Sequence, residues 1–392
     1  MPLLAVAYLA FVGLGLPDAL NGVAWPSVRD AFGLGQGGLG LILAALCSGY
    51  LLSSTLAGTA RRALPLGDLL TLSSLAAVLA LAGYALTSSW PLLLACAVVL
   101  GLAGGAIDAA LNLFVATRHG PREMNWLHAF YGVGAALGPL VLTAALATGW
   151  GWRAGVAAIA AALACLTLLY AATRGAWSAG DPAPPADADA PSPVTLVHAL
   201  RHGGTRLQVA AFFAQTGVEA TAGQWAFTLL TESRGLGTAA AGAWAAAYWA
   251  TFTLGRLLAG AVVPKLGAVR LTRLGALGAA AGALLLAASP ALPAGVGVAA
   301  LLLTGLSIAP FFPGLMAETP RRLGPAVAAH AVGLQVAGTV LGAAAVPALA
   351  GVLAERLGLE AVAWVALAAA LALLALNEAI VATLDRPSPA AA

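Results

Sequence analysis

The sequence predicts an all-α membrane protein with twelve transmembrane helices, and three observations lead to this fold class. Of the 392 residues, 61% are hydrophobic and only 8% are charged, whereas soluble domains carry roughly 25% charge. The apolar residues form long runs, and the basic residues are concentrated in alternate loops between these runs. This composition leaves too little polar surface for a water-soluble protein and excludes a disordered chain. Three cysteines are too few for a disulfide-stapled fold.

The apolar runs are long enough to cross a membrane as helices, which need about 20 residues each. A transmembrane β-barrel would instead show alternating segments of about ten residues. In lipid the backbone must satisfy its own hydrogen bonds, so continuous apolar runs form helices. The predicted spans are 3–27, 37–59, 66–87, 91–116, 124–148, 152–173, 207–231, 238–262, 271–289, 293–318, 325–350 and 360–383.

The placement of the basic residues predicts the orientation of the helices. One set of alternate loops, together with the C-terminal tail, holds thirteen Lys and Arg, and the opposite set holds four. Because basic residues are enriched on the cytoplasmic side, we expect an inner-membrane protein with both termini in the cytoplasm. The thirteen are Arg61, Arg62, Arg118, Arg122, Arg174, Arg201, Arg206, Lys265, Arg270, Arg273, Arg321, Arg322 and Arg386, and the four are Arg29, Arg153, Arg234 and Arg356.

The segment between the sixth and seventh spans divides the chain into two halves. Its central stretch, 181–193, is rich in Pro, Ala and Asp, which is typical of a linker rather than a packed core. The following residues predict an interfacial helix that ends with Arg201 and Arg206 at the lipid surface. The expected parts are an N-terminal six-helix bundle over 1–174, a cytoplasmic linker over 175–206 and a C-terminal six-helix bundle over 207–392.

The two halves repeat one another, which predicts pseudo-symmetric bundles. Gly134-xxx-Gly138 recurs as Gly338-xxx-Gly342 at an offset of 204, and other Gly pairs share this offset. Two parallel six-helix repeats with a cytoplasmic linker are the layout of the major facilitator superfamily. The Gly-rich stretches suit close helix contacts. The prolines expected to kink or break helices are Pro26, Pro139, Pro310, Pro313 and Pro347.

Ionisable residues inside the spans are the candidates for function, because a charge in the hydrocarbon core is costly. Asp18 lies in the first span, Asp108 near the middle of the fourth and Glu219 in the middle of the seventh. A carboxylate held out of water can bind and release a proton as a transport site alternates between the two faces. These three residues are therefore the predicted proton-coupling groups. The alternative is a structural role for Asp108 and Glu219, and a place in a water-filled vestibule for Asp18, which lies nearer the outer end of its span.

Amides, hydroxyls and aromatic rings near these carboxylates suit a polyhydroxylated neutral solute such as a sugar. Asn112 follows Asp108 by four residues, on the same helix face. Trp225 is expected either to stack on a ligand ring or simply to pack between helices. His128 has an interfacial role as its alternative. The predicted substrate-binding residues are Asn21, Asn112, Asn125, His128, Tyr131, Glu219, Gln224, Trp225 and Gln335.

Several function classes lack the motifs that they require. The sequence contains no His-Glu-xx-His zinc motif, no Gly-x-Ser-x-Gly nucleophile turn and no Walker loop, so we expect no enzyme. Cys47, Cys96 and Cys165 are isolated within spans and predict neither a metal nor a redox role. We expect no cofactor beyond a coupling ion, H⁺ or alternatively Na⁺, and no nucleic-acid partner. The expected partners of the monomer are the lipid bilayer and a small solute.

Five stretches in the two halves carry a family resemblance: GAIDAALN at 105–112, NWLHAFYGVGA at 125–135, EATAGQW at 219–225, YW at 248–249 and GRLLAG at 255–260. They resemble the fucose permease branch of the major facilitator superfamily. The resemblance implies proton-coupled sugar uptake, with Asp108 and Asn112 in the position of a coupling group and His128 at a sugar-site position. The first span departs from the branch pattern Leu-Asn-Asp-Pro, because Gly22 follows Leu20-Asn21 and Asp18 lies one turn earlier.

A second function is open on the same fold, because fold does not fix substrate. The alternative to sugar symport is an exporter of drugs or small metabolites that works as a proton antiporter. Such a site would be wide and rich in Met and Phe, and the chain has only three Met. The composition therefore weighs against the exporter without excluding it.

Overall fold

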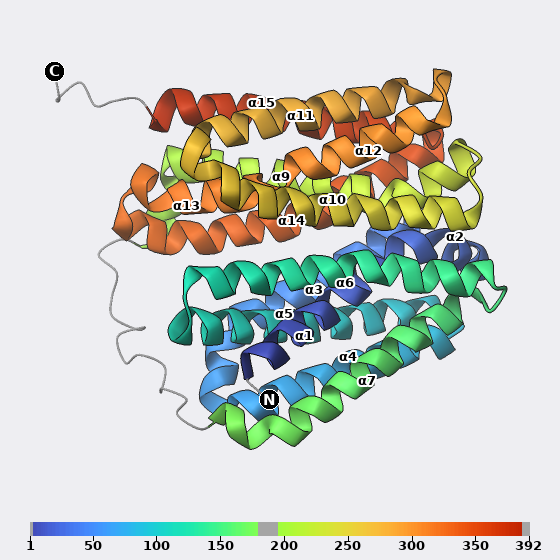
Figure 1. Ribbon diagram of the computed structural model, residues 1–392, viewed down its shortest axis with the longest axis horizontal. Helices are drawn as coiled ribbons and strands as arrows, with labels where there is room; N and C mark the ends of the chain where they lie inside the picture. The colour runs from blue at the N-terminus through green and yellow to red at the C-terminus, as the bar shows by residue number, and fades with distance from the viewer. Residues whose placement is uncertain (1–2, 179–194, 386–392) are drawn as a thin grey trace. The chain divides into compact units, whose positions relative to one another are not determined.

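The computed structural model describes residues 3–178 and 195–385, and these form helices without any β-strand (Figure 1). The predicted all-α class is confirmed. The first seven helices are α1 Leu3–Asp18, α2 Leu20–Phe32, α3 Gly38–Ala63, α4 Leu66–Leu86, α5 Trp90–Arg118, α6 Pro121–Ala147 and α7 Gly151–Ser178. The others are α8 Leu196–Arg201, α9 Gly203–Thr228, the π-helix η2 Leu229–Ser233, α10 Thr238–Leu266, α11 Ala268–Ala288, the 3₁₀ turn η3 Ser289–Ala291, α12 Ala294–Ile308, α13 Phe311–Leu323, α14 Pro325–Leu357 and α15 Ala361–Leu384.

All twelve predicted spans are helical in the part of the chain that the structure describes. Eleven of them are long and apolar enough to cross a membrane. The twelfth, predicted over 207–231, is α9 followed by η2. It is the most polar of the set because Gln208, Gln215, Glu219 and Gln224 lie on it.

The chain folds into two compact units. The first comprises Met1–Ala190 and Ala226–Ala250, and the second comprises Pro191–Trp225 and Thr251–Ala392. The end of α9, the π-helix η2 and the first part of α10 thus belong to the first unit. The Pro-rich stretch 181–193 and Arg386 lie outside the described residues, whereas the predicted interfacial segment contains the short helix α8.

Glycines bring α1 and α6 into close contact in the first unit. A methyl group on Gly134 or Gly138 would collide with the backbone carbonyl of Val12 or Leu16, respectively. The repeated pair behaves in the same way in the second unit, where Gly342 of α14 faces the carbonyl of Phe213 on α9. The close contacts predicted for the two Gly-rich stretches are confirmed, and in each half they join the first and fifth spans.

A second close contact joins α3 and α5. A methyl group on Gly101 would meet the carbonyl of Leu46, and one on Gly105 would meet the carbonyl of Tyr50. Gly49 faces α5 in the same manner, at the carbonyl of Val98. This packing holds the Tyr50 ring beside the part of α5 that follows Gly105.

Two spans are interrupted. The first is divided at Ala19, directly after Pro17 and Asp18, into α1 and α2. The tenth is divided at Ala309 and Pro310 into α12 and α13, as expected for Pro310. The other prolines predicted to kink or break helices, Pro26, Pro139, Pro313 and Pro347, lie inside continuous helices.

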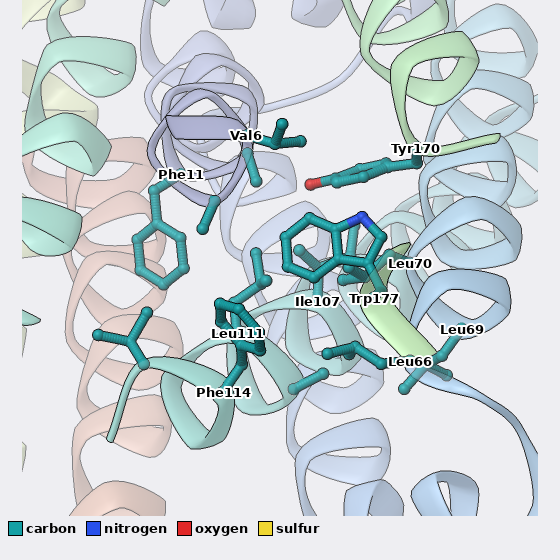
Figure 2. Packing of buried hydrophobic residues seen from close by; sticks show 14 of the residues in the cluster. Val6, Phe11, Leu66, Leu69, Leu70, Ile107, Leu111, Phe114, Tyr170 and Trp177 are labelled. Atoms are coloured by element: carbon teal, nitrogen blue, oxygen red, sulfur yellow. The ribbon is translucent and has the colours of Figure 1, made fainter. Parts of the chain in front are cut away.

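The apolar core of the first unit joins α1, α4, α5, α6 and α7 (Figure 2). Trp177 is fully buried, and its ring lies edge-on to Phe114 at 5.0 Å and to Tyr170 at 6.4 Å between centroids. The indole Nε1 donates to Thr173 Oγ1 at 3.0 Å, so the polar atom of this large side chain is satisfied. This core fixes the helices that carry Asp18 and Asp108.

Candidate functional site

Asp18 is the last residue of α1, and its side chain is exposed at the interruption of the first span. The hydroxyl of Tyr131 on α6 donates a hydrogen bond to Asp18 Oδ2. The close packing of the two helices makes this contact possible, since Gly15 lies against the backbone carbonyl of Tyr131. Asp18 and Tyr131, both predicted site residues, are therefore brought together.

Asp108 is half-buried on α5 and accepts hydrogen bonds at both carboxylate oxygens. Tyr50 Oη donates to Oδ2 at 2.6 Å, and Asn112 Nδ2 donates to Oδ1 at 3.0 Å. Asn112 Nδ2 also lies 3.0 Å from the backbone oxygen of Asp108. The spacing of four residues thus produces the side-chain pair that the sequence predicts.

Tyr50 lies near both carboxylates. It is bonded to Asp108 and also lies within electrostatic reach of Asp18. We refer to Asp18, Tyr131, Tyr50, Asp108 and Asn112 as the carboxylate cluster. Tyr50 was not among the predicted site residues. Its signal in the sequence is a single tyrosine in the second span, beside Gly49.

Three other predicted site residues of the first unit, His128, Asn125 and Asn21, differ in how deeply they are buried. His128 is half-buried on α6, and its ring lies edge-on to Phe11 with centroids 5.5 Å apart. Asn125, one turn earlier on α6, is exposed. Asn21 on α2 is 2% exposed, and its Nδ2 has no partner among the described residues. Most buried amide groups have a hydrogen-bond partner, so Asn21 keeps an unused donor.

Glu219 belongs to a separate polar group in the second unit. Gln215 Nε2 donates to Glu219 Oε2 at 2.7 Å, and Thr216 Oγ1 donates to Gln215 Oε1 at 3.0 Å. Glu219 is half-buried and Gln215 is buried. Gln215 was not predicted, although it precedes Glu219 by four residues on the same helix face.

Three predicted residues of the second unit are buried in helix packing. Trp225 is 0% exposed, and its Nε1 donates to the carbonyl oxygen of Pro347 at 3.1 Å. Gln335 is also 0% exposed, and its Nε2 donates to Thr319 Oγ1 at 3.0 Å and to Gln208 Oε1 at 3.2 Å. Gln224 is 4% exposed. The geometry favours the packing alternative for Trp225, and Gln335 cross-links α9, α13 and α14.

A charged network lies at the end of α2 in the first unit, and the sequence did not predict it. Arg29 Nη2 pairs with Glu232 Oε1 of η2 at 2.9 Å. Gln36 Nε2 donates to Glu232 Oε2 at 3.3 Å and accepts a hydrogen bond from Trp25 Nε1 at 3.0 Å. These contacts hold α2 and the loop after it against η2.

The described residues contain no cluster of three His, Cys, Asp or Glu that would suit a metal ion. The carboxylates, hydroxyls and amides described above can exchange protons, and they can form hydrogen bonds with the hydroxyls of a solute. Hydrogen-bonded carboxylates inside the spans of a polytopic helical protein are typical of membrane transporters.

The chain belongs to the Major Facilitator Superfamily, whose family model matches residues 7–336. It is accordingly a membrane transporter and not an enzyme. No curated protein matches the sequence. The predicted membership of the superfamily is thus confirmed. The family match does not identify the substrate or the coupling ion, which are proposed below.

Solved structures of the same fold cover almost the whole chain. FucP in the outward conformation is 18% identical, with a TM-score of 0.64, over 97% of this chain and 99% of the other. A variant of the E. coli fucose:proton symporter FucP is also 18% identical, with a TM-score of 0.63, over 96% and 98%. The nucleoside transporter NupG is 15% identical, with a TM-score of 0.71, over 99% and 100%. At these identities the likeness shows the shared fold.

Proposed function

We propose that the protein is a proton-coupled symporter of a sugar or a sugar-containing solute, working by alternating access. One observation carries the proposal: Asp18 and Asp108 each accept a hydrogen bond from a tyrosine hydroxyl, and Tyr50 lies within electrostatic reach of both. Carboxylates inside spans are the usual proton carriers of transporters. Glu219 is a third candidate carrier, in the second unit.

The hydrogen bonds of Asp108 suggest how a proton would act on the helices. An ionised carboxylate only accepts hydrogen bonds, and it can satisfy Tyr50 of α3 and Asn112 of its own helix together. A proton added to Oδ2 turns that oxygen into a donor, which opposes the hydroxyl of Tyr50. The protonated oxygen is a weaker acceptor, so the hydroxyl would turn to accept this proton instead of donating to Oδ2. Protonation would thus alter the contact between α3 and α5.

The substrate class is inferred from the groups around the carboxylate cluster. Tyr131, His128 and Asn125 lie about one turn apart on α6 and offer a hydroxyl, an imidazole and an amide. Such groups hydrogen-bond the hydroxyls of a neutral sugar. The titles of the similar structures name a fucose:proton symporter and a nucleoside transporter, and both solutes contain a sugar ring. These likenesses support a sugar ring as the recognised element.

The location and orientation are part of the same proposal. The thirteen-to-four distribution of basic residues supports an inner-membrane protein with both termini in the cytoplasm. We propose that the transporting species is a monomer, since each unit contains its own polar groups. The coupling ion is proposed to be H⁺, because carboxylates inside spans are the usual proton carriers of transporters.

Uptake into proteoliposomes tests this proposal. Purified protein is reconstituted, and a panel of labelled hexoses and nucleosides is offered with and without an inward proton gradient. We expect accumulation of at least one of these solutes under the gradient and none in its absence. A sodium gradient at constant pH is the comparison. Failure to move any sugar or nucleoside, or uptake that ignores the proton gradient, would refute the proposal.

A further inference from the structure

An apolar groove of about 1020 Å³ lies along α9, α14 and α15 of the second unit. This volume is at the upper end of the roughly 300–1,000 Å³ that is typical of small-molecule sites. Its walls consist almost entirely of Leu, Val, Ala and Phe. The polar exceptions lie at its ends: Thr205 and Arg206 at the start of α9, and Glu360 beside the start of α15. The groove is separate from the carboxylate cluster, which lies in the first unit.

The groove is long enough for the acyl chains of a phospholipid, which reach across about half of the bilayer core. On α14 the lining residues extend from Gly338 to Leu357, roughly 28 Å at the rise of an α-helix. The hydrocarbon core of a bilayer is about 30 Å thick. Leu341 and Leu349 line the groove and are 55% and 52% exposed. The groove is therefore open to its surroundings along its side and is not an enclosed cavity.

The α9 end of the groove offers hydrogen-bond donors to an anion. Thr205 is 0% exposed, lines the groove, and its hydroxyl has no hydrogen-bond partner among the described residues. Arg206 is exposed and lines both this groove and an adjoining cavity of about 500 Å³. Both residues lie in the first turn of α9, which begins at Gly203. Free N–H groups and the helix dipole favour negative charge there.

The short helix α8 places apolar side chains beside this polar end. Leu196, Val197 and Leu200 are 50%, 57% and 45% exposed, and Leu200 also lines the groove. Exposed leucines next to Arg201 form the pattern of a helix that lies in the headgroup region of a membrane. The apolar wall of the groove, the hydrogen-bond donors at its end and the apolar side chains of α8 thus lie next to one another.

We propose that this groove binds one anionic phospholipid, with its phosphate at Thr205 and Arg206 and its acyl chains along α14 and α15. The phosphate supplies the negative charge that complements Arg206 and an acceptor for the Thr205 hydroxyl. The acyl chains cover the half of the apolar wall that is nearer to Arg206. A free phosphate would satisfy the donors but leave the wall bare, so one amphipathic molecule accounts for both features. The inference does not depend on the proposed function.

Native mass spectrometry of the full chain tests the inference. The protein is delipidated in detergent and titrated with phosphatidylglycerol or with the zwitterionic phosphatidylethanolamine. We expect one phosphatidylglycerol to bind with clear preference. Arg206→Gln should weaken its binding about tenfold, and Thr205→Val should weaken it less. Ala372→Trp, which fills the groove, should abolish binding. Thermal melting of each variant verifies that the fold is retained.

Two matched controls make the result specific. Arg201→Gln removes a neighbouring charge on α8 that does not line the groove, and Leu371→Trp adds an indole beside Ala372 but away from the groove. Both should bind the lipid like the unchanged protein. The inference is overturned if all variants bind equally, or if glycerol phosphate without acyl chains competes as well as the lipid. It is also overturned if a dimer forms that Ala372→Trp disrupts, since a second copy then occupies the groove.

Discussion

At the scale of single residues, the hydroxyl of Tyr50 is the contact that most distinguishes Asp108 from an ordinary buried acid. It comes from another helix, whereas the second donor, Asn112, comes from the same helix. Because Tyr50 lies on α3 and Asp108 on α5, the protonation state of Asp108 affects the contact between these two helices. The two donors can be tested separately.

Tyr50→Phe should destabilise the protein by about 2 kcal/mol, because a hydrogen bond to a charged group is lost. It should also lower gradient-driven uptake. Tyr84→Phe is the matched control, since Tyr84 is 1% exposed and its hydroxyl has no partner among the described residues. Thermal melting in detergent measures both variants. Equal melting temperatures for the two variants would show that the Tyr50 hydroxyl contributes nothing.

Asp108→Asn should remove the proton-binding group while keeping the shape of the side chain. We expect gradient-driven uptake to fall to the background of empty liposomes. Asp68→Asn, a change in the first turn of α4, provides the control and should leave uptake intact. Undiminished driven uptake in the Asp108 variant would remove this residue from the coupling mechanism.

At the scale of helices, glycine positions determine which spans touch most closely. Gly342 and Gly333 both lie on α14 and differ in one respect. A Cβ on Gly342 would collide with the backbone of Phe213, whereas a Cβ on Gly333 would meet nothing within 4 Å. Glycine is thus needed for a close helix contact at position 342 but not at position 333.

Gly342→Ala should therefore destabilise the protein by about 1–3 kcal/mol, the usual cost of overpacking. Gly333→Ala should be neutral or stabilise it by up to about 1 kcal/mol, because alanine favours a helix more than glycine does. Thermal melting of the pair measures the difference. A Gly342 variant as stable as the Gly333 variant would contradict the close contact between α9 and α14.

The end of α15 is tied to α13 by an ion pair whose strength depends on pH. Burial opposes ionisation of Asp385, but hydrogen bonds from Arg322 and Arg321 outweigh it and hold its pKa below the ordinary 3.8. Arg322 donates to the two carboxylate oxygens at 3.0 and 2.7 Å. A lowered pKa means that the stabilisation is present above pH 3.8 and is lost as the pH falls through the folded-state value.

Asp385→Asn should consequently lower stability at pH 7 by about 2 kcal/mol. Below pH 3.8 the difference from the unchanged protein should shrink as Asp385 takes up a proton in the latter. Thermal melting across pH 3 to 7 follows this difference. A difference that is constant over the whole range would contradict the role assigned to the charge of Asp385.

At the scale of the whole molecule, alternating access requires that some contacts break during each cycle. Arg29 follows the first span of the first sequence repeat, and Glu232 follows the first span of the second repeat, although both residues lie in the first unit. Their ion pair therefore joins segments of the two repeats. We expect this contact to open and close as the transporter works. A covalent bond at the same position would then stop transport.

A double variant, Arg29→Cys with Glu232→Cys, tests this expectation after Cys47, Cys96 and Cys165 are replaced by alanine. Oxidation should block uptake, and a reducing agent should restore it. Each single cysteine variant is the control and should be insensitive to oxidation. Full transport by the oxidised double variant would show that this contact stays closed throughout the cycle.

Much of the fold and part of the candidate site could be predicted from the sequence. Helices follow from local apolar runs, and the pair Asp108 and Asn112 follows from helical periodicity. Tyr50 and Gln208 could not be assigned, because their partners lie far away in the chain. For Trp225 the neighbouring Gln224 suggested ligand stacking. The hydrogen bond from Trp225 to the carbonyl of Pro347 instead depends on tertiary packing, which the local sequence does not reveal. The placement of residues 226–250 in the first unit also follows from tertiary contacts alone.

The interruption of the first span at Ala19 has a consequence for hydration. Pro17, two residues before the break, cannot donate a backbone hydrogen bond, so the carbonyls of the preceding turn lose a usual partner. In a membrane such groups persist only when protein or water covers them. The side chain at the break, Asp18, is exposed. Water that solvates these carbonyls would lie beside the carboxylate, so the break itself would provide the wet route by which protons reach Asp18.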